Sequence, residues 1–436
     1  MIFIVNRVSG KLGIWGPEVN SSGIKRFTQS PMLAMLSRFK TLNTKFENYD
    51  PTTLVIDDFK NRKLYKNFII PSGVTHSPWD WTGYTDLGKV YDPYAQKRKS
   101  VFAHINPKML GALRKRRAYL LLDQSHEGYH TDWLFDWFHD CCNKYDVSPD
   151  RVIYVTGNLS VEKQYEAYCS NKNIQTKLFV VPHIQFEELI YDSAQKQVSV
   201  LPTLKDHLTY KSQNKIHLYN CFQKRARPHR IWMFYYLYKN NLLDDGLNSM
   251  NTFGNSFYEG KSISPEEQQE LLKILPMYPR KGLNDFMKGE FEGPLGGQYE
   301  RDLYHQETRD SWVSVVSEAS YAENTCFISE KSFKPIAARH PFIMCGNKNS
   351  LTYLKELGYK TFEGFIDESY DSMNTWERYQ AIIDNLLKIK SMSEKQKLDW
   401  YASMQDILEH NFETLKANTT RVLPSSVLKI QEYVGG

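Results

Sequence analysis

The sequence lacks long apolar runs and cysteine motifs. No stretch approaches the roughly eighteen apolar residues that a membrane-spanning helix needs, and the apolar opening at residues 1–5 is shorter than the core of a secretory signal. The six cysteines include no Cys-x-x-Cys pair, which favours reduced, buried thiols. We therefore expect a cytoplasmic protein with no membrane span and no export signal.

Common nucleotide-binding signatures are also missing. No two aspartates stand two positions apart, so the chain has no Asp-x-Asp pair of the kind with which many transferases hold a metal-bound nucleotide diphosphate. Residues 83–89 have the spacing of a phosphate-binding P-loop, but Val90 stands where Ser or Thr is required, and no Gly-x-Gly-x-x-Gly occurs. We expect no P-loop kinase, no obligatory metal and no other cofactor.

The composition is that of a folded protein with more than one core. Of the 436 residues, 41% are apolar, 14% aromatic and 24% charged, which is enough to form two cores, and this length exceeds what one core usually organises. The net charge of +5 is too small for a general nucleic-acid coat. It suits a local basic pocket for an anionic ligand.

Apolar runs that stop at polar residues predict buried parallel strands. In the first half these runs are residues 53–56, 118–122, 152–155 and 179–182, with a one-sided helix at 132–145 between the second and third. Strand, helix and strand in this order form a βαβ unit. After a polar, non-periodic stretch at 196–214, the pattern predicts strands at 216–219, 312–316 and 341–346, and a helix at 231–243.

The break in periodicity predicts two domains with a boundary near residue 210. We expect an N-terminal, acceptor-side α/β domain at 1–210 and a C-terminal, ligand-binding α/β domain at 211–436. The second domain would carry a loop-like insertion at 251–310 and a helical tail. Because open parallel sheets bind ligands at the carboxyl ends of their strands, we expect two Rossmann-like domains that face a central cleft.

A basic cluster follows the predicted strand that ends at Asn220 and leads into the apolar helix at 231–243. Its members are Lys224, Arg225, Arg227, His229 and Arg230. Helix N-terminal amides add positive potential at such a crossing. Because guanidinium groups bind phosphate oxygens bidentately and keep their charge, the cluster predicts a site that can stabilise a departing diphosphate. The alternative is a solvated basic turn.

A second cluster combines a predicted short strand at 326–328 with a helix start. Ser329 stands at the N-cap position, and Glu330 and Lys331 follow in the first turn. A carboxylate there can hold ribose hydroxyls, and an ammonium can meet a phosphate. Alternatively, Glu330 only complements the helix dipole and Lys331 is solvated.

One motif points to a different chemistry. His126, Glu127 and His130 match His-Glu-x-x-His, in which two histidines on one helical face bind zinc and the glutamate is the general base. The predicted strand directly before the motif and Gly128 inside it argue against the required helix. A zinc-dependent hydrolase therefore stays as an alternative.

At the basic and second clusters, the sequence resembles the α-1,3-fucosyltransferase family of inverting GT-B enzymes. The family has an arginine after a strand that ends in Ser-Asn, and here Arg230 follows Tyr219-Asn220. Its motif Phe-Glu-Asn-Ser, then Tyr-Val/Ile-Thr-Glu-Lys, resembles residues 317–320 and 327–331. Ala319 and Phe327 replace the family's asparagine and tyrosine.

The resemblance implies a GT-B-like fold and an inverting, metal-independent glycosyltransferase, a hexosyl- or fucosyltransferase that uses a GDP- or UDP-linked sugar. It implies that Arg230 and Lys331 hold the donor diphosphate and that Glu330 holds the ribose. The full expected set of donor-binding residues is Asn220, Arg225, Arg227, Arg230, Phe327, Ser329, Glu330 and Lys331.

The acceptor side would have to supply a general base. Glu127, and after it Asp123, follow the predicted strand at 118–122 and are our candidates, although such residues are often helix caps or turns. We expect a glycan or another hydroxyl compound as acceptor. Basic runs at 97–99 and 114–117 leave modified DNA open, or form a solvated face. A non-catalytic nucleotide-sugar-binding protein is a further alternative.

Overall fold

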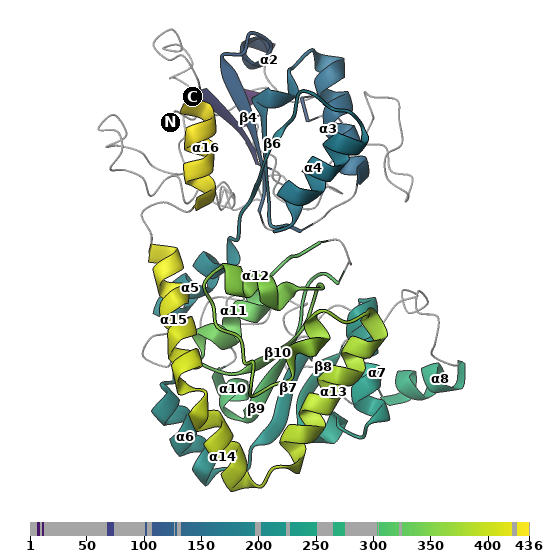
Figure 1. Cartoon of the computed structure of the whole chain (residues 1–436), viewed down its shortest axis with the longest axis vertical. Helices are drawn as coiled ribbons and strands as arrows, with labels where there is room; N and C mark the ends of the chain where they lie inside the picture. Colours follow the sequence, from purple (N-terminus) through teal and green to yellow (C-terminus); the bar gives the residue numbers. More distant parts are fainter. Residues whose placement is uncertain are drawn as a thin grey trace. The chain divides into compact units, whose positions relative to one another are not determined.

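The computed structural model describes residues 7–8, 11–12, 68–73, 101–102, 107–125, 127–128, 132–196, 202–223, 227–250, 265–274, 303, 305–321, 325–420 and 425–435. The chain divides into two compact units, shown in Figure 1. Unit 1 comprises Met1–Gln185 and Arg421–Gly436, and unit 2 comprises Phe186–Thr420. The strand predicted at 53–56 and most of the insertion predicted at 251–310 lie outside the described residues.

Unit 1 contains a four-stranded parallel sheet in the order β3-β4-β5-β6. Its strands are β3 (Phe68–Gly73), β4 (Ala118–Gln124), β5 (Val152–Thr156) and β6 (Phe179–Pro182). The last three confirm predicted strands. The sequence did not predict β3, whose apolar run is broken by Pro71, a residue that is tolerated in edge strands. A separate short hairpin pairs β1 (Arg7–Val8) with β2 (Lys11–Leu12).

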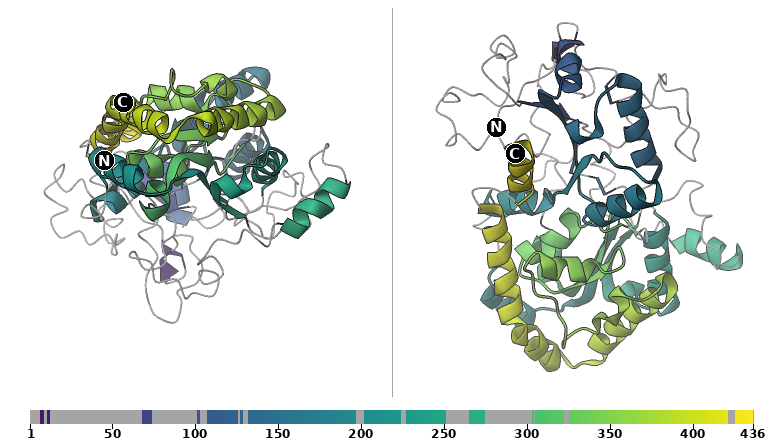
Figure 2. Two further views of the ribbon diagram at one scale, coloured as in Figure 1. Left: turned by 90° about the horizontal axis from the view of Figure 1, so that it is seen from below. Right: turned by 45° about the horizontal axis from the view of Figure 1, so that its top comes forward.

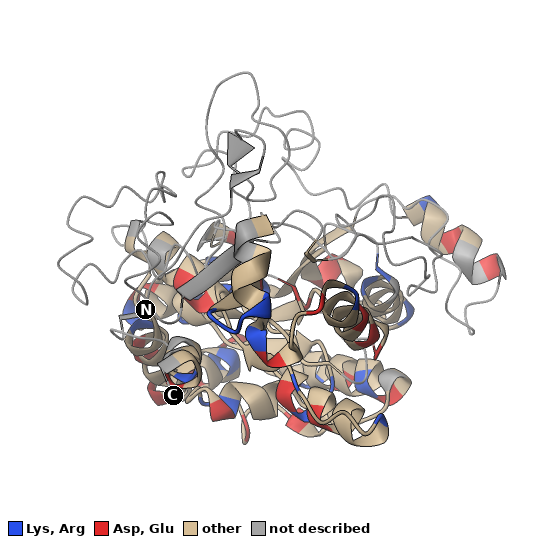
Figure 3. Ribbon diagram, turned by 90° about the horizontal axis from the view of Figure 1, so that it is seen from above, with Lys and Arg blue, Asp and Glu red and all other residues tan. Residues whose placement is uncertain are grey.

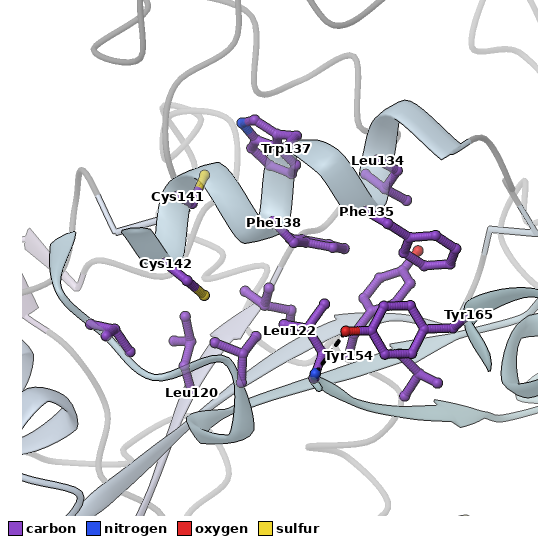
Figure 4. Packing of buried hydrophobic residues seen from close by; sticks show 14 of the residues in the cluster. Leu120, Leu122, Leu134, Phe135, Trp137, Phe138, Cys141, Cys142, Tyr154 and Tyr165 are labelled. Carbon is purple, nitrogen blue, oxygen red and sulfur yellow. Dashed lines mark hydrogen bonds between the residues drawn. The ribbon is translucent and has the colours of Figure 1, made fainter. Parts of the chain in front are cut away.

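Helices cover both faces of the unit 1 sheet. The helices α2 (Pro107–Arg114), α3 (Asp132–Tyr145) and α4 (Val161–Asn171) supply side chains to one apolar cluster. Successive right-handed crossovers in one direction place such helices on the same face. Figure 4 shows Phe138 and Cys142 of α3 pointing toward Leu122 and Leu120 of β4. The bounds of α3 confirm the helix predicted at 132–145.

The opposite face of this sheet is covered by the last helix of the chain, α16 (Ser425–Gly435) (Figure 1). Ile430 and Val434 are buried against odd-numbered residues of β4 and β5. The ring of Tyr433 stacks on Phe179 with centroids 4.0 Å apart. Residues 421–436, which the sequence assigned to the second domain, therefore belong to unit 1.

Unit 2 contains a second four-stranded parallel sheet, in the order β10-β9-β7-β8. Its strands are β7 (His217–Gln223), β8 (Gly246–Met250), β9 (Ser311–Ser317) and β10 (Phe342–Cys345). Every residue of β9 is buried, as expected for a central strand. The two sheets confirm the predicted α/β class with parallel strands. The arrangement of the units around a cleft stays a prediction.

Two crossovers of the unit 2 sheet, from β7 to β8 and from β9 to β10, run in opposite directions. From β7 the chain passes through α7 (Pro228–Lys239) to β8, and from β9 it passes through α11 (Glu330–Ala337) to β10 on the other side. Right-handed crossovers place α7 and α11 on opposite faces. The switch in direction lies between β7 and β9, which is the point where open α/β sheets bind their ligands.

The remaining helices of unit 2 are α5 (Phe186–Lys196), α6 (Leu204–Gln213), α8 (Pro265–Ile274), α10 (His305–Arg309), α12 (Ser350–Glu356), α13 (Thr375–Ser391), α14 (Glu394–Ser403) and α15 (Gln405–Thr420). The last three confirm the predicted helical tail, and α8 extends away from the rest of unit 2 (Figure 2). Because α5 packs against α11 and α15, the division falls at Gln185, not near residue 210, which lies within α6.

Two expectations from composition can be compared with the structure. All six cysteines are buried thiols outside any disulfide, as predicted. Among the described helices, none is both long and apolar enough to cross a lipid bilayer.

The packing of α16 predicts how unit 1 responds to mutation. Ile430→Ala removes a side chain that is only 2% exposed, so we expect the free energy of unfolding of unit 1 to fall by about 2–4 kcal/mol in urea denaturation. The matched control is Lys429→Ala, which removes an exposed ion pair with Glu162 and should cost less than about 1 kcal/mol. Equal effects of the two variants would show that α16 does not contribute to the core.

Candidate functional site

Three segments meet at the carboxyl edge of the unit 2 sheet, at the switch point. They are the start of α7 after β7, the loop from Glu318 to the start of α11 after β9, and the loop that follows β10. Ser317 at the end of β9 pairs with Cys345 at the end of β10. All three segments leave the same edge, because the strands are parallel.

The start of α7 holds the loop after β9 through three side chains. Pro228 begins the helix, where its missing N–H costs nothing, and Arg227 is the N-cap residue. Arg227 donates to the carbonyl oxygen of Ala319. The Nη2 of Arg230 donates to the carbonyl oxygen of Glu318 at 3.0 Å, and the Nε2 of His229 bonds to the same oxygen at 2.8 Å. Since a carbonyl only accepts, His229 carries its proton on Nε2.

The carboxylate of Glu318 is the centre of this edge. It is fully buried and accepts four hydrogen bonds: Oε1 from Ser329 N (3.1 Å) and Ser332 Oγ (2.6 Å), and Oε2 from Ala319 N (2.9 Å) and Ser329 Oγ (2.5 Å). These bonds tie the first turn of α11 to the end of β9. A Cβ on Gly346 would lie 3.1 Å from Glu318 Cγ, so the loop after β10 approaches this carboxylate closely.

The start of α11 confirms one prediction and corrects another. Ser329 is the N-cap residue, its hydroxyl accepts from Lys331 N, and Glu330 and Lys331 lie in the first turn as predicted. The strand predicted at 326–328 is wrong, because these residues form no strand within the described part of the chain. Side chains satisfy the backbone instead: Phe327 N donates to Asn347 Oδ1 at 3.1 Å, and Ser329 N donates to Glu318.

Charged side chains of both signs lie close together at this edge. The cationic ones include Arg227, Arg230, Lys331 and Lys334, and the carboxylates include Glu318 and Glu330. Lys331 forms an ion pair with Glu330 and also donates to Ser329 Oγ.

The pKa shifts leave Arg230 and Glu330 charged and His229 neutral at neutral pH. Burial, followed by repulsion from Arg227, lowers the pKa of Arg230 to about 10, so it stays protonated. Burial raises the pKa of Glu330, but Lys331 and Lys334 lower it by more, and the net shift is downward. Burial and the neighbouring Arg230 lower the pKa of His229 to about 3, so this ring is neutral.

The structure brings together five of the eight predicted donor-binding residues: Arg227, Arg230, Ser329, Glu330 and Lys331. Asn220 lies within the sheet, where its Nδ2 donates to Ser311 Oγ at 2.7 Å and Ser314 Oγ at 2.9 Å. Phe327 is buried and contacts Phe186 edge-on. Arg225 lies outside the described residues.

The sequence did not identify Glu318 as a site residue, although it stood in the fucosyltransferase-like pattern. The sequence did contain a signal for Glu318, because it is an acidic residue close behind a predicted buried strand. The same kind of position was the reason for choosing Asp123. His229 was recognised only as one charge of the basic cluster. Its role as a neutral donor depends on its burial, which sequence does not give.

The two candidate bases lie at the carboxyl edge of the unit 1 sheet, as predicted. Asp123 is buried, and its Oδ1 accepts from Ser125 N (3.0 Å) and Ser125 Oγ (2.7 Å). Glu127 is half-buried, and its carbonyl oxygen accepts from Gly157 N (2.9 Å) and Thr156 Oγ1 (3.0 Å). Their catalytic role stays a prediction.

The zinc motif falls largely outside the described part of the chain, because His126 and His130 are not among the described residues. Among the residues that are described, no three His, Cys, Asp or Glu side chains gather in a way that could hold a metal ion.

No model of a known protein family matches the chain, and no curated protein matches it. Solved structures with partial similarity include three involved in trehalose chemistry by title. A UDP-forming α,α-trehalose-phosphate synthase from Burkholderia vietnamiensis has 14% identity and a TM-score of 0.42, covering 99% of this chain and 90% of that one. An α,α-trehalose 6-phosphate synthase from Burkholderia multivorans has 13% identity and a TM-score of 0.40, covering 94% and 80%.

The third is the N-terminal domain of a trehalose-6-phosphate phosphatase from Candida albicans, with 10% identity and a TM-score of 0.39, covering 98% of this chain and 85% of that one. Because all three TM-scores are below 0.5, no argument about this chain rests on these likenesses. The α/β class rests on the chain's own two parallel sheets.

The hydrogen bonds of the Glu318 carboxylate predict that a conservative substitution there lowers the stability of unit 2 strongly. Glu318→Gln replaces one acceptor oxygen by an NH2 group that faces two donors, so we expect unit 2 to lose about 2–5 kcal/mol of unfolding free energy in urea. Glu377→Gln, at an exposed glutamate of α13, is the matched control and should change stability by less than about 0.5 kcal/mol. A wild-type-like Glu318→Gln would show that the four hydrogen bonds do not hold this edge together.

Proposed function

We propose that the protein is a glycosyltransferase that moves a sugar from a nucleotide-diphosphate donor to a hydroxyl acceptor. The supporting observation is the cluster of cationic side chains, among them Arg227, Arg230 and Lys331, at the switch point of the unit 2 sheet. The diphosphate of a nucleotide sugar carries two negative charges, which guanidinium and ammonium groups bind. Because Arg227 and Arg230 repel one another, a dianionic ligand would stabilise the cluster.

The exposure of the cationic side chains indicates which of them can contact a ligand. The Lys331 side chain is 28% exposed and Arg227 is half-buried, so both can reach a ligand. Arg230 is 4% exposed and holds the Glu318 carbonyl, so it contributes its field and positions the loop. In this proposal Lys331 exchanges its Glu330 partner for a phosphate oxygen. Glu330 is then left to accept from ribose hydroxyls, as the resemblance to fucosyltransferases implies.

Fixed cations also account for a reaction without an obligatory metal. As the bond between sugar and diphosphate breaks, negative charge grows on the leaving oxygen, and preorganised Arg and Lys side chains stabilise it. For an inverting displacement, a base removes the acceptor proton on the opposite face of the sugar. We propose Glu127 for this role, with Asp123 as second choice, and a fucose-like or hexose donor linked to GDP or UDP.

A polyanionic acceptor such as modified DNA has less support. The basic run 114–117 lies between α2 and the amino end of β4, at the opposite edge from the candidate bases. Arg116 is paired with Asp150, and Arg114 donates to the carbonyl oxygen of Tyr145. In Figure 3, basic and acidic residues are interspersed over the described helices and strands. A neutral glycan is therefore the acceptor that we favour.

The test is donor turnover. With a panel of GDP- and UDP-sugars and excess EDTA, we expect the wild-type protein to release nucleoside diphosphate from at least one donor. Lys331→Met and Arg227→Met should each lower kcat by about 10²-fold or more, because each removes a contact to the leaving group. Lys360→Met, at an exposed lysine beyond α12, is the matched control and should retain the wild-type rate.

Three results would contradict the proposal. They are no release from any donor, release that depends on added metal, and full activity in both cation variants. Stoichiometric zinc that is lost in His130→Ala would favour the hydrolase alternative. Donor binding without turnover would favour a binding protein. In an active protein, Glu127→Gln should abolish transfer to the acceptor with donor affinity nearly intact, and weakened donor binding would remove Glu127 as the base.

A further inference from the structure

A buried arginine of α13 holds the loop that follows β10. Helix α13 packs against α7 and against the strands β7 and β10 (Figure 1). Arg378, near the start of this helix, is 3% exposed, and its Nη2 donates to the carbonyl oxygens of Gly346 (2.7 Å) and Asn347 (3.2 Å). Gly346 is the residue that closely approaches the Glu318 side chain. Arg378 therefore acts on one of the three segments that meet at the carboxyl edge of the unit 2 sheet.

Stability alone does not account for an arginine at this position. Its hydrogen bonds go to neutral carbonyl groups, and the carboxylate of Asp371 acts on it through charge. Its buried Nε has no hydrogen-bond partner in the described part of the chain. Burying a charged group with an unused donor costs free energy, and an apolar side chain of similar size avoids that cost. The gain from Arg378 therefore lies in the fixed position of the loop that it holds.

Asn347 connects this loop to the start of α11. Its Oδ1 accepts from Phe327 N at 3.1 Å, and its Nδ2 donates to Thr325 Oγ1 at 3.1 Å. Phe327 stands two positions before the N-cap residue Ser329. These side-chain bonds fix the backbone just before the helix. The position of the first turn of α11 therefore depends on where Arg378 places the backbone of Asn347.

Arg378 also contacts the loop that follows β9. Its guanidinium carbon lies 4.8 Å from the ring centroid of Tyr321, which is a cation–π contact. The Tyr321 ring stacks on His229, with centroids 5.3 Å apart and an angle of 6° between the planes. His229 in turn donates to the carbonyl oxygen of Glu318. One side chain of α13 thus contacts the loops after β9 and β10, and through Tyr321 it is connected to the start of α7.

We propose that Arg378 is a positioning residue of the candidate donor site, which holds the loops after β9 and β10 and so keeps the first turns of α7 and α11 in the geometry that binds the diphosphate. It acts through these loops and not by contact with the donor. The inference rests on the proposed function and adds α13 to the elements that determine the site. Placement affects the rate because fixed cations stabilise a leaving group only at the correct distance, and a displacement of about 1 Å can cost about 10²-fold.

The first test compares donor turnover by Arg378→Met and by the wild-type protein, at a temperature well below the unfolding transition. We expect kcat to fall at least about tenfold and the donor KM to change less than about threefold, because the bound donor meets less precisely placed cations. Arg378→Lys keeps the charge and can still donate, so it should recover part of the lost rate. The matched control is Arg339→Met, which removes a largely buried arginine that pairs with Glu409 at the amino end of β10 and should keep the wild-type kcat.

The second test needs no substrate. Amide hydrogen exchange in the segment 325–332 should be about tenfold faster in Arg378→Met than in the wild-type protein, because the amide of Phe327 loses its fixed acceptor. In Arg339→Met this segment should exchange at the wild-type rate. If Arg378→Met does not fold, Asn347→Ala takes its place in both tests with the same expected results.

Unchanged exchange in Arg378→Met would overturn the inference, and so would an unchanged kcat in an active Arg378→Met protein. A loss of kcat equal to that of Arg339→Met would also overturn it, because it would show a general effect on folding. Failure of the proposed function gives a different result. Faster exchange in Arg378→Met, together with no donor turnover by the wild-type protein, would overturn the proposed enzyme and leave the hold of Arg378 on the two loops in place.

Discussion

The buried carboxylate of Glu318 determines the geometry of the candidate site. A charged group without exposure is tolerated only when its lone pairs are used, and here four donors from three residues supply the partners. The same residue offers its carbonyl oxygen to His229 and Arg230. One residue at the end of β9 thus joins the first turns of α7 and α11, which lie on opposite faces of the sheet.

This arrangement also explains why the cations stay at the edge. Arg227 and Arg230 face backbone carbonyls of the loop, and Lys331 and Lys334 share Glu330. His229 is neutral and adds no further positive charge. The result is a set of fixed donors at a switch point, and in the proposed function this preorganisation would stabilise a leaving diphosphate without a metal.

The sequence predicted those parts of the fold that depend on local pattern. Helix α3 and strand β6 have the predicted bounds, because unbroken periodicity and length identify such elements. The strand at 326–328 failed for a physical reason: an apolar run forms a strand only where a neighbouring strand supplies its hydrogen bonds, and here the side chain of Asn347 accepts from Phe327 N instead. The return of α16 to unit 1 depends on contacts far apart in sequence, which no local pattern contains.

For the site, the sequence identified the charged groups and missed their organisation. Arg227, Arg230, Ser329, Glu330 and Lys331 were recognisable from residue type and position next to helix starts. Asn220 was chosen for the same reasons, but its amide holds β7 to β9. Which polar residues face a ligand and which hold the scaffold depends on burial and partner geometry, and these follow only from the folded chain.

The most direct measurement of the central claim is calorimetric titration of the wild-type protein with GDP, UDP and their monophosphates in excess EDTA. The account predicts binding of one nucleoside diphosphate per chain without metal, with affinity that falls at least about tenfold, or 1.4 kcal/mol, for the monophosphate. It also predicts that the affinity falls as salt rises, because charge carries the binding. Binding that needs Mg²⁺, or that is equally strong for mono- and diphosphate, would contradict the account.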